Sequence, residues 1–256
     1  MSPHPVNISA VIITFNEADN IGACIDSLSG VADEIIVVDS YSTDATSEIC
    51  HQKGVHFVQH KFEGHIEQKN YALTLAKYPY ILSLDADEVL SELLRKSILE
   101  VKQHPDYDGY YLNRLNNYCG RWIRYGNWYP DRKLRLWNKT KGQWGGVNPH
   151  DRLIMDLGAT TSGLNGDLMH YTIKSVAQHL GQINKFSSIR AEQLFKQGKK
   201  PTLYFLWCKP MVSFIWSYFV KLGFLDGYFG FIISFNSAYA VFLRYAKLKE
   251  LWNQPR

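Results

Sequence analysis

The first hundred residues alternate between short apolar runs and helical patterns. The apolar runs are rich in β-branched residues and occupy positions 8–14, 34–39, 55–58 and 80–85. Runs that are apolar at nearly every position are typical of strands buried on both faces, as in a parallel sheet. Helical patterns fill the intervals, at 20–29, 44–53, 65–77 and 91–104. The alternation predicts a doubly wound α/β sheet whose ligands bind at the carboxyl ends of the strands.

The later sequence has a different character. Residues 106–166 lose the helical period and are rich in Tyr, Trp, Asn, Gly and Arg, with short strands expected at 109–115 and 133–137. An amphipathic helix is expected at 175–197, and residues 202–251 are apolar and crowded with aromatic rings. We therefore expect an α/β domain over residues 1–172 and a helical, aromatic-rich extension over residues 173–256.

The composition narrows the classes of protein and of partner. Hydrophobic residues make up 46% of the chain and charged residues 20%, which is typical of a globular protein with a sizeable core. A net charge of +4 without concentrated basic runs argues against a nucleic-acid partner. The four cysteines (24, 50, 119 and 208) form neither a zinc pattern nor a disulfide framework, and the first ten residues resemble no signal peptide. We expect a cytoplasmic protein with reduced thiols.

The triplet Asp85-Ala86-Asp87 is the sharpest chemical feature of the sequence. Two carboxylates one residue apart at the end of a buried strand are costly to keep charged unless they have a partner. A divalent cation resolves that conflict, because Mg²⁺ and Mn²⁺ prefer one or two carboxylates together with substrate phosphate oxygens. The alternative is a solvated acidic turn completed by Glu88.

The loop after the first strand, Thr14-Phe15-Asn16-Glu17, lacks the glycines that a dinucleotide-binding protein places there. This excludes a nicotinamide-dependent oxidoreductase of the usual kind. Asp39 ends the second strand, and Ser40, Ser42 and Thr43 follow it, so this turn offers hydrogen-bonding groups to a base or ribose. The same side chains could instead serve only to begin the next helix.

These segments together resemble a known family. TFNEADNI, IIVVDSYSTDAT and GHIEQKNYALTLAKYPYILSLDADE are similar, in order and spacing, to family 2 glycosyltransferases with the GT-A fold. The likeness extends over most of residues 8–175 and is greatest to the bacterial branch that builds lipopolysaccharide core and related envelope glycans. It implies a nucleotide-diphospho-sugar transferase fold, which is a Rossmann-like mixed sheet flanked by helices, with a C-terminal helical extension.

The resemblance also implies roles for individual residues. Thr14, Asn16 and Glu17 would lie against the nucleoside, and Asp39 with Ser42 would bind the base or ribose. Lys69 and Asn70 match the family's basic-Asn pair before the fourth strand, where Lys69 replaces the usual Arg and offers a point charge rather than a fork. Asp85 and Asp87 match the metal-binding Asp-x-Asp, which implies Mg²⁺ or Mn²⁺ as cofactor.

Further matches lie beyond the acidic triplet. Residues 129–137 resemble an acceptor-side segment, in which Arg135 is either a phosphate ligand or a strand-edge cation. His150 and Asp151 resemble the family's His-acidic motif, where relatives usually carry Glu, and Asp151 is the candidate general base. The alternative is a hydrogen-bonded loop pair. His170 matches a segment that returns to the metal, although a lone His is more often structural, as we expect for His56, His60 and His65.

The C-terminal part combines aromatic runs with flanking cations. Its longest uncharged run, residues 227–243, is shorter than the roughly 20 apolar residues that a membrane span requires. Helices with rings on one face and lysines at the edges are typical of membrane interfaces with anionic lipids. The alternative is a helical hairpin that packs on the first domain or self-associates. The membrane-interface interpretation predicts a protein that is peripheral to the cytoplasmic face of the inner membrane.

The sequence therefore favours a metal-dependent, inverting hexosyltransferase. The donor is expected to be a nucleotide-sugar, such as UDP-glucose or another UDP-hexose, and the acceptor a glycolipid or oligosaccharide. Two other functions stay open at this stage. A catalytically silent nucleotide-sugar or glycan-binding module would explain Asp151 in place of Glu. A nucleotidyltransferase shares the sheet and the carboxylate pair, but the loop at 14–17 lacks the glycine-rich, basic phosphate loop of that class.

Overall fold

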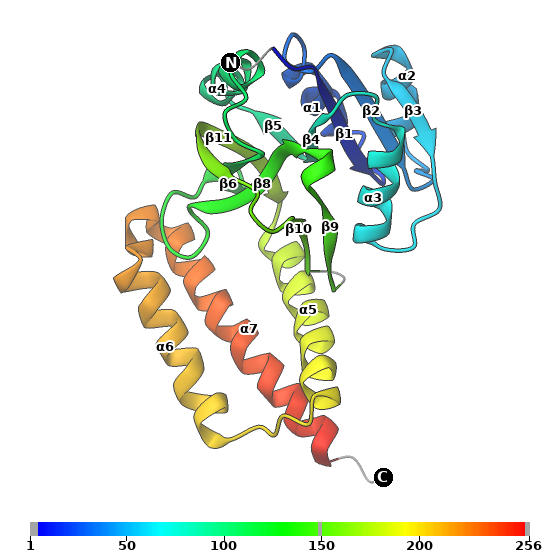
Figure 1. Ribbon diagram of the computed structural model, residues 1–256. Coiled ribbons are helices and arrows are strands. Elements are labelled where there is room, and N and C mark those ends of the chain that lie inside the picture. Colours follow the sequence, from blue (N-terminus) through cyan, green and yellow to red (C-terminus); the bar gives the residue numbers. More distant parts are fainter. Residues whose placement is uncertain (1–4, 148–149, 254–256) are drawn as a thin grey trace. The chain divides into compact units, whose positions relative to one another are not determined.

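The computed structural model describes residues 5–147 and 150–253 (Figure 1). The chain divides into two compact units. The first unit comprises residues 1–114 and 132–170, and the second comprises residues 115–131 and 171–256. The second unit therefore combines one short internal segment with the whole C-terminal part of the chain.

Four parallel strands form one half of the main sheet. They lie in the order β3-β2-β1-β4 and are β1 (Ile8–Thr14), β2 (Glu34–Asp39), β3 (His56–Gln59) and β4 (Tyr80–Asp85). Neighbouring residues of β1 are buried in different cores, with Ile12 in one and Val11 in the other. Burial on both faces explains why these runs are apolar at nearly every position.

The sheet continues beyond β4 in the order β8-β6-β11-β5. These strands and the short β7, which pairs with β6, are β5 (Glu88–Leu90), β6 (Gly109–Tyr118), β7 (Arg121–Trp122), β8 (Asp131–Asn138) and β11 (Thr161–Ile173). β8 is antiparallel to β4, and β5 is antiparallel to β11 in a register that places His170 opposite Glu88. A separate antiparallel hairpin joins β9 (Gly142–Val147) to β10 (His150–Met155).

Helices cover both faces of the parallel half. They are α1 (Ile21–Ser27), α2 (Thr46–Gln52), α3 (His65–Leu75) and α4 (Glu92–Gln103), and a 3₁₀ turn η1 (Lys139–Lys141) precedes β9. Ile21, Cys50 and Leu94 place α1, α2 and α4 in the core with Ile12, whereas Ala72 places α3 in the core with Val11. The two hydrophobic cores thus lie on opposite faces of one sheet.

The predicted mixed sheet with flanking helices and a helical C-terminal part is confirmed. The strands predicted at 8–14, 34–39 and 80–85 have those bounds, and the strand predicted at 55–58 is shifted by one residue. The structure adds elements that the sequence did not indicate, namely β5, β9, β10 and β11. These strands contain Gly, Asn and charged residues, so their composition gives little strand signal.

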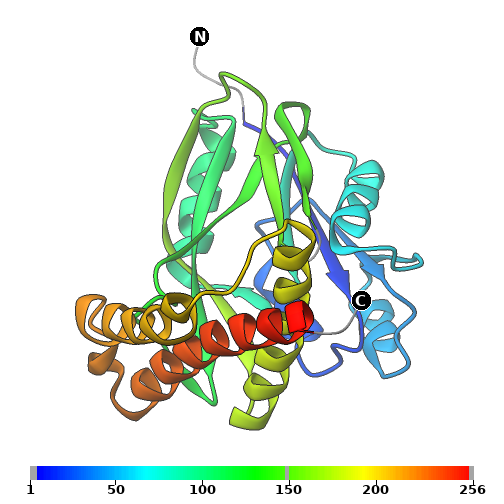
Figure 2. The same cartoon turned by 90° about the horizontal axis from the view of Figure 1, so that it is seen from below.

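The second unit consists mainly of helices. They are α5 (Val176–Lys196), the π-helical turn η2 (Tyr204–Cys208), α6 (Lys209–Ile215), the π-helical turn η3 (Trp216–Val220), the 3₁₀ turn η4 (Gly223–Asp226) and α7 (Gly227–Asn253). α7 packs against both α5 and α6, and Figures 1 and 2 show the three side by side. η2, α6 and η3 follow one another without a gap.

The interior of this unit holds a neutral polar cluster. His179 Nδ1 lies 3.1 Å from the Tyr118 hydroxyl and 3.0 Å from Asn236 Nδ2. His179 and Asn236 are buried among Tyr118, Ile173 and Ile233. Burial lowers the pKa of His179 below its usual value and raises the pKa of Tyr118 to about 12. Each of these polar side chains has a hydrogen-bond partner, as buried polar groups require.

Close backbone contacts hold η4 against the helices on either side of it. The helical segments Tyr204–Val220 and Gly223–Asn253 are bent by 71° relative to each other. Leu222 adopts a left-handed φ of 57° at the break. A Cβ atom added to Gly230 would lie 1.8 Å from the Gly223 carbonyl oxygen, so no side chain fits at this position. A Cβ atom added to Gly223 would likewise lie 2.7 Å from the Ser217 carbonyl oxygen of η3, so the contacts on both sides of η4 require glycine.

An uncharged stripe of exposed side chains runs along η2, α6 and η3. We call this the apolar stripe; it comprises Leu203, Tyr204, Trp207, Met211, Val212, Ile215, Trp216, Phe219 and Val220. Its spacing of three or four residues places the members on one helical face. Of the helices that the structure describes, none is by itself both long and apolar enough to cross a bilayer, whereas the bent pair passes that test of length and composition together.

Candidate active site

Three polar residues predicted to bind substrate end three adjacent strands. Thr14 pairs with Asp39 across β1 and β2, and Ile13, the residue before Thr14, pairs with Asp85 across β1 and β4. These positions lie at the carboxyl ends of parallel strands, where ligands of open α/β sheets bind. The Thr14 hydroxyl is buried and has no hydrogen-bond partner among the described residues. A bound ligand could supply that partner.

Asp39 connects the loops that follow β1 and β2. Its buried carboxylate accepts hydrogen bonds from the Ser42 backbone N–H at 2.8 Å and from the Ser42 hydroxyl. Asn16, which has a left-handed φ of 54°, donates its N–H to Ser42 Oγ at 2.8 Å and accepts from the Thr43 N–H at 2.8 Å. The two loops are thus held as one wall, with the exposed rings of Phe15 and Tyr41 beside it.

Two further residues hold the same loops. The Glu17 N–H donates to Thr46 Oγ1 at 2.8 Å, and the Glu17 carboxylate accepts from Asn20 Nδ2 at 2.6 Å. The fully buried Gln68 donates to Ser40 Oγ at 3.1 Å and contacts His60 Nδ1 at 2.8 Å. The sequence analysis missed Gln68, because a polar residue within a helix gives no sign that it is buried.

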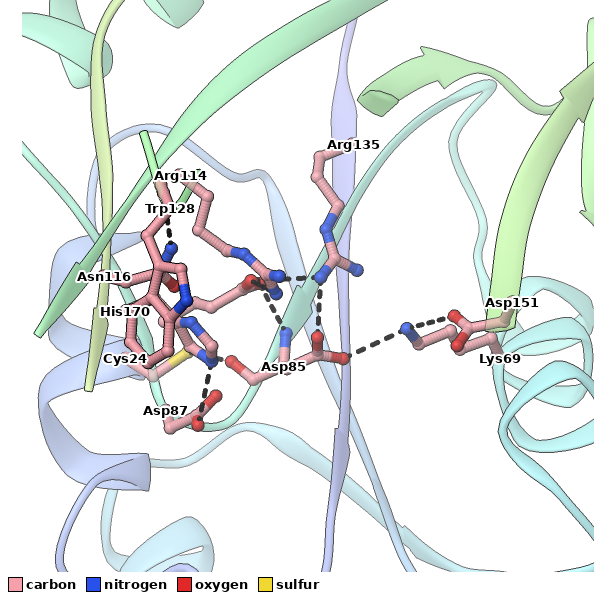
Figure 3. Close-up of polar contacts among 11 residues, drawn as sticks. Cys24, Lys69, Asp85, Asp87, Arg114, Asn116, Trp128, Arg135, Asp151 and His170 are labelled. Carbon is pink, nitrogen blue, oxygen red and sulfur yellow. Dashed lines mark hydrogen bonds and ion pairs between the residues drawn. The ribbon is translucent and has the colours of Figure 1, made fainter. Parts of the chain in front are cut away.

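Asp85 lies between two cations rather than beside Asp87. Its Oδ2 accepts from Arg135 Nη2 at 2.6 Å, and its Oδ1 lies 3.2 Å from Lys69 Nζ. Arg135 Nη2 also donates to Glu88 Oε1 at 3.0 Å, and Glu88 Oε2 accepts the Asp85 backbone N–H at 2.9 Å. Figure 3 shows Asp85 between Arg135 and Lys69. Glu88 is fully buried and belongs to this network, which the sequence reading of an acidic turn did not anticipate.

The balance of burial and charge fixes the ionisation of this cluster. Burial alone would raise the pKa of Asp85, but Arg135 and Lys69 outweigh it and hold that pKa well below its usual value. Burial opposes the charge of Arg135 as well, yet Asp85 and Glu88 raise its pKa above the usual value. Asp85 and Arg135 are therefore both charged, and neither can be removed without leaving a buried charge.

Lys69 brings the candidate general base into the site. Its ammonium is 2.8 Å from Asp151 Oδ2 and 3.2 Å from Asp85 Oδ1, and it lies 4.4 Å from the centre of the Trp144 ring. The Lys69 side chain is 5% exposed and that of Asp151 is 16% exposed, so solvent screens this pair weakly. Figure 3 shows Asp151 beyond Lys69 on the side away from Arg135.

Asn70 positions the hairpin that carries Asp151. Its amide nitrogen donates to the Trp144 carbonyl at 2.9 Å, and its amide oxygen accepts the Trp144 N–H at 3.1 Å. Both polar atoms of Asn70 are thus engaged with the backbone of β9. Because Arg152 and Asp151 pair with Gly145 and Gly146 of that strand, the contact helps to fix Asp151.

The expected metal residues separate into two groups. Asp87 Oδ2 lies 3.2 Å from His170 Nε2, whereas the Asp85 carboxylate faces Arg135 and Lys69. Among the residues that the structure describes, no three His, Cys, Asp or Glu side chains gather as a preformed ligand set. One carboxylate and one imidazole fit an ion that keeps its other positions for substrate phosphates and water. Asp87 and His170 therefore fit Mg²⁺ or Mn²⁺.

The remaining predicted histidines lie elsewhere. His150 begins β10, but its side chain and the preceding residues 148–149 lie outside the described part of the chain. His60 stacks on Tyr71 at 3.7 Å between ring centres and bonds Gln68, which is a structural role. His56 begins β3 and His65 begins α3.

A cavity of about 730 Å³ lies beside Asp85. Asp85, Lys69 and Asp151 line it together with Trp144 and the basic segment that includes Arg132 and Arg135. Its volume falls in the range of small-molecule sites, roughly 300–1,000 Å³. Arg135 is 3% exposed, so it is a buried group within the site rather than a strand-edge cation.

Comparisons with known proteins show the family of the chain. Residues 9–155 match the model of the family described as Glycosyl transferase family 2. The chain is 35% identical over 254 residues to an uncharacterized glycosyltransferase of Rickettsia bellii, with 95% of this chain and 86% of that protein covered. It is 30% identical over 247 residues to the lipopolysaccharide core biosynthesis glycosyltransferase LpsC of Rhizobium meliloti, with 94% and 91% covered.

A solved structure supports the fold over nearly the whole chain. The mannosyltransferase PcManGT of Pyrobaculum calidifontis, determined with GDP-Man and Mn²⁺, is similar with a TM-score of 0.57. The likeness covers 99% of this chain and 89% of that one at 14% sequence identity. At this identity the comparison carries the fold alone, and that fold is GT-A.

Proposed function

The chain belongs to glycosyltransferase family 2, and from that premise we propose that it transfers a hexose from a nucleotide-sugar to an envelope glycan. The observation that carries the proposal is the line of charged residues Asp85, Lys69 and Asp151, which borders a cavity at the carboxyl end of the sheet. The donor is a UDP-hexose such as UDP-glucose. The acceptor is a glycolipid or core oligosaccharide, which the similarity to LpsC over most of both chains supports.

The nucleoside of the donor binds at the wall formed by the first two loops. The Thr14 hydroxyl lacks a partner among the described residues, and Asp39, Ser42 and Asn16 keep the loops in one arrangement. The exposed ring of Phe15 or Tyr41 offers a stacking surface to the base. The diphosphate follows toward Asp87 and His170.

Asp87 and His170 would hold Mg²⁺ or Mn²⁺. When bound, the ion supplies charge neutralisation to the departing nucleoside diphosphate. Lys69 contributes a second positive charge, which it places between Asp85 and Asp151. As an ammonium it offers a point charge, so it can exchange a carboxylate partner for a phosphate without a fixed planar geometry.

Asp151 takes the proton of the acceptor hydroxyl. The acceptor oxygen forms a bond to the anomeric carbon while the bond from that carbon to the diphosphate breaks, and the nucleoside diphosphate leaves. Attack from the face opposite the leaving group inverts the configuration. Trp144 and Arg135 lie beside this position and limit the access of water.

The donor site is tested by calorimetric titration with UDP in the presence and absence of Mn²⁺. We expect binding that requires Mn²⁺ and that Asp87→Asn weakens at least about tenfold, because the variant loses a charged metal ligand. The matched control is Asp106→Asn, which neutralises an exposed carboxylate that lies outside the candidate site. If no nucleoside diphosphate binds with or without Mn²⁺, the donor proposal is wrong; if GDP binds and UDP does not, only the base is corrected.

Turnover separates an active transferase from the two other functions. Incubation of UDP-hexoses with a core oligosaccharide should release UDP and produce a glycosylated acceptor. Release of pyrophosphate from UTP and a sugar phosphate would indicate a nucleotidyltransferase instead. Tight donor binding without any product from a full panel of donors and oligosaccharides would favour the silent module.

We also propose that the second unit binds the cytoplasmic face of the inner membrane. The apolar stripe exposes nine large side chains, with exposed fractions of 63% for Trp207, 66% for Met211 and 56% for Phe219. Lys221 lies 6.0 Å from the Trp216 ring, and Lys199 and Lys200 are exposed before Leu203, so cations flank the stripe. An apolar face with cationic edges is suited to an anionic lipid surface.

Vesicle flotation tests this membrane proposal. The wild-type protein should float with vesicles that contain phosphatidylglycerol and less with pure phosphatidylcholine. Replacing Met211 and Phe219 by Ser should abolish flotation, whereas Leu93→Ser, an equally exposed leucine on α4, should not. A protein that never floats and instead forms a dimer through the stripe would support self-association.

A further inference from the structure

The active-site cavity carries more positive charge than a donor diphosphate requires. Six cationic side chains line it, Lys69, Arg114, Arg132, Lys133, Arg135 and Arg152, against two carboxylates, Asp85 and Asp151. Glu88 pairs with Arg114 and Arg135, and with Glu88 included the cations at the cavity still outnumber the carboxylates among the described residues. Such a field attracts an anionic acceptor more strongly than a neutral one.

Arg135 shows most directly that an anion belongs here. Only its Nη2 is engaged, by Asp85 and Glu88, while Nε and Nη1 are buried and have no hydrogen-bond partner among the described residues. The side chain is 97% buried, since 3% of it is exposed, and it borders the cavity. Buried guanidinium donors without partners are costly, and the oxygens of an oxyanion are strong acceptors for charged N–H groups.

Two further arginines extend the site from Arg135 toward solvent. Arg132 and Arg152 are exposed, and the Arg132 guanidinium lies 5.4 Å from the centre of the Tyr111 ring. Trp144 covers the inner end, with Lys69 at 4.4 Å and Arg135 at 5.7 Å from its ring centre. Cations against an aromatic wall are weakly hydrated, so their attraction for an anion is less screened than at an open surface.

Most of this charge lies apart from the residues assigned to the donor. Asp39, Asp87 and His170 do not line this cavity, whereas the candidate base Asp151 does. Lys69, which is expected to contact the donor phosphate, lines the cavity together with Asp85, so the two sites adjoin at that end. We propose that the cavity binds an oxyanion, a phosphate or carboxylate, that the sugar acceptor carries near the hydroxyl group to be glycosylated. The inference rests on the proposed function and assigns to it an anionic class of acceptor.

The proposed site also has a positioning role. With its oxyanion on Arg135, Arg132 and Arg152, the acceptor presents its hydroxyl group to Asp151, which lies between Lys69 and Arg152 on the same wall. A hexose of the donor then approaches from the side of Asp85. Contacts of one oxyanion with several arginine side chains restrict rotation of the acceptor, which favours reaction at one hydroxyl group.

Calorimetric titration of the full chain saturated with UDP and Mn²⁺ tests the inference. The probes are glucose 6-phosphate, glucuronate and glucose. We expect at least one of the two anionic sugars to bind about tenfold or more tightly than glucose, since hydrogen bonds to charged groups are the stronger ones. Arg132→Gln combined with Arg152→Gln should remove this preference and leave UDP affinity unchanged. Lys96→Gln, an exposed cation on α4, should keep it.

Arg135→Lys provides a second readout. It keeps the charge of the site but loses the Nε and Nη1 donors, so anionic-sugar affinity should fall while a thermal melt confirms that the variant is folded. Equal affinity for the three sugars would overturn the inference, and so would displacement of glucose 6-phosphate by UDP, which would assign these cations to the donor. If UDP itself does not bind, the donor proposal fails. The same sugar titrations, carried out without UDP, still test whether the cavity binds an anionic sugar.

Discussion

The buried polar groups of the two units differ in charge. In the first unit, Asp85 and Arg135 are charged, and Arg135 donates hydrogen bonds of 2.6 Å to Asp85 and 3.0 Å to Glu88. In the second unit, His179, Tyr118 and Asn236 form a cluster that burial keeps neutral. Charged groups in a closed network can attract a charged substrate, whereas neutral ones only fix the packing of helices. The difference indicates which unit carries the chemistry.

The largest expected effect lies at the candidate base. Asp151→Asn should reduce turnover by about 10²–10⁴-fold, because the amide cannot take the acceptor proton. UDP affinity in the presence of Mn²⁺ should change little, since Asp151 is not among the donor residues. Steady-state assays and calorimetry together check this. A variant with normal turnover would assign Asp151 to the packing around Lys69.

The buried charge network should dominate the stability of the first unit. Arg135→Met leaves Asp85 and Glu88 without their shared partner, and we expect a loss of about 3–5 kcal/mol in the free energy of unfolding. Lys53→Met breaks the exposed pair with Asp26, whose side chain is 64% exposed, and should cost about 0–1 kcal/mol. Urea unfolding of both variants measures the contrast. Similar losses in the two variants would mean that the buried network contributes no more to stability than an exposed ion pair.

Packing should dominate in the second unit instead. Gly230→Ala places a Cβ 1.8 Å from the Gly223 carbonyl oxygen, so α7 must move away from η4, at a cost of about 1–3 kcal/mol or more. Gly181→Ala on α5 has no atom within 4 Å of the new Cβ and should stabilise the helix by about 0.5–1 kcal/mol. Thermal melts of the two glycine variants should therefore shift in opposite directions.

The neutral cluster predicts the smallest effect, a dependence on pH. Burial lowers the pKa of His179 in the folded state, so the unfolded chain binds the proton first as pH falls. Its contribution to stability is complete above the unfolded pKa of about 6.5 and is lost as pH falls from there through the folded pKa. Urea unfolding at pH 8 and at pH 5.5 should show a decrease that His179→Gln reduces. An equal decrease in that variant would place the titrating group elsewhere.

The sequence predicted the parallel half of the fold closely. Residues 8–14 and 80–85 are apolar at nearly every position because both faces of these strands are buried. Composition alone therefore locates them. β9, β10 and β11 were not predicted, since their strands depend on partners far along the chain rather than on local propensity. Motifs identified Asp39, Lys69, Asp85 and Asp151 as candidates.

The contacts among the candidates could not be predicted in the same way. Arg135 is 50 residues from Asp85 and Asp151 is 82 residues from Lys69, and only the register of β8 and β10 brings them together. Glu88 looked like part of an exposed turn because nothing in its neighbours indicates that it faces inward. The basic residues 132, 133 and 135, close together in the sequence, were the signal for a pocket that binds an anion.

Glu88 has a consequence for how this sequence can change over generations. Its carboxylate accepts the backbone N–H of Asp85 and is itself paired with Arg114 and Arg135. A substitution at any one of positions 85, 88, 114 and 135 leaves an unbalanced charge in the interior, whereas a joint replacement of the two carboxylates and the two arginines keeps the charge balanced. These four positions should therefore be inherited as a set, kept together or exchanged together, while Lys53 and Asp26 change independently.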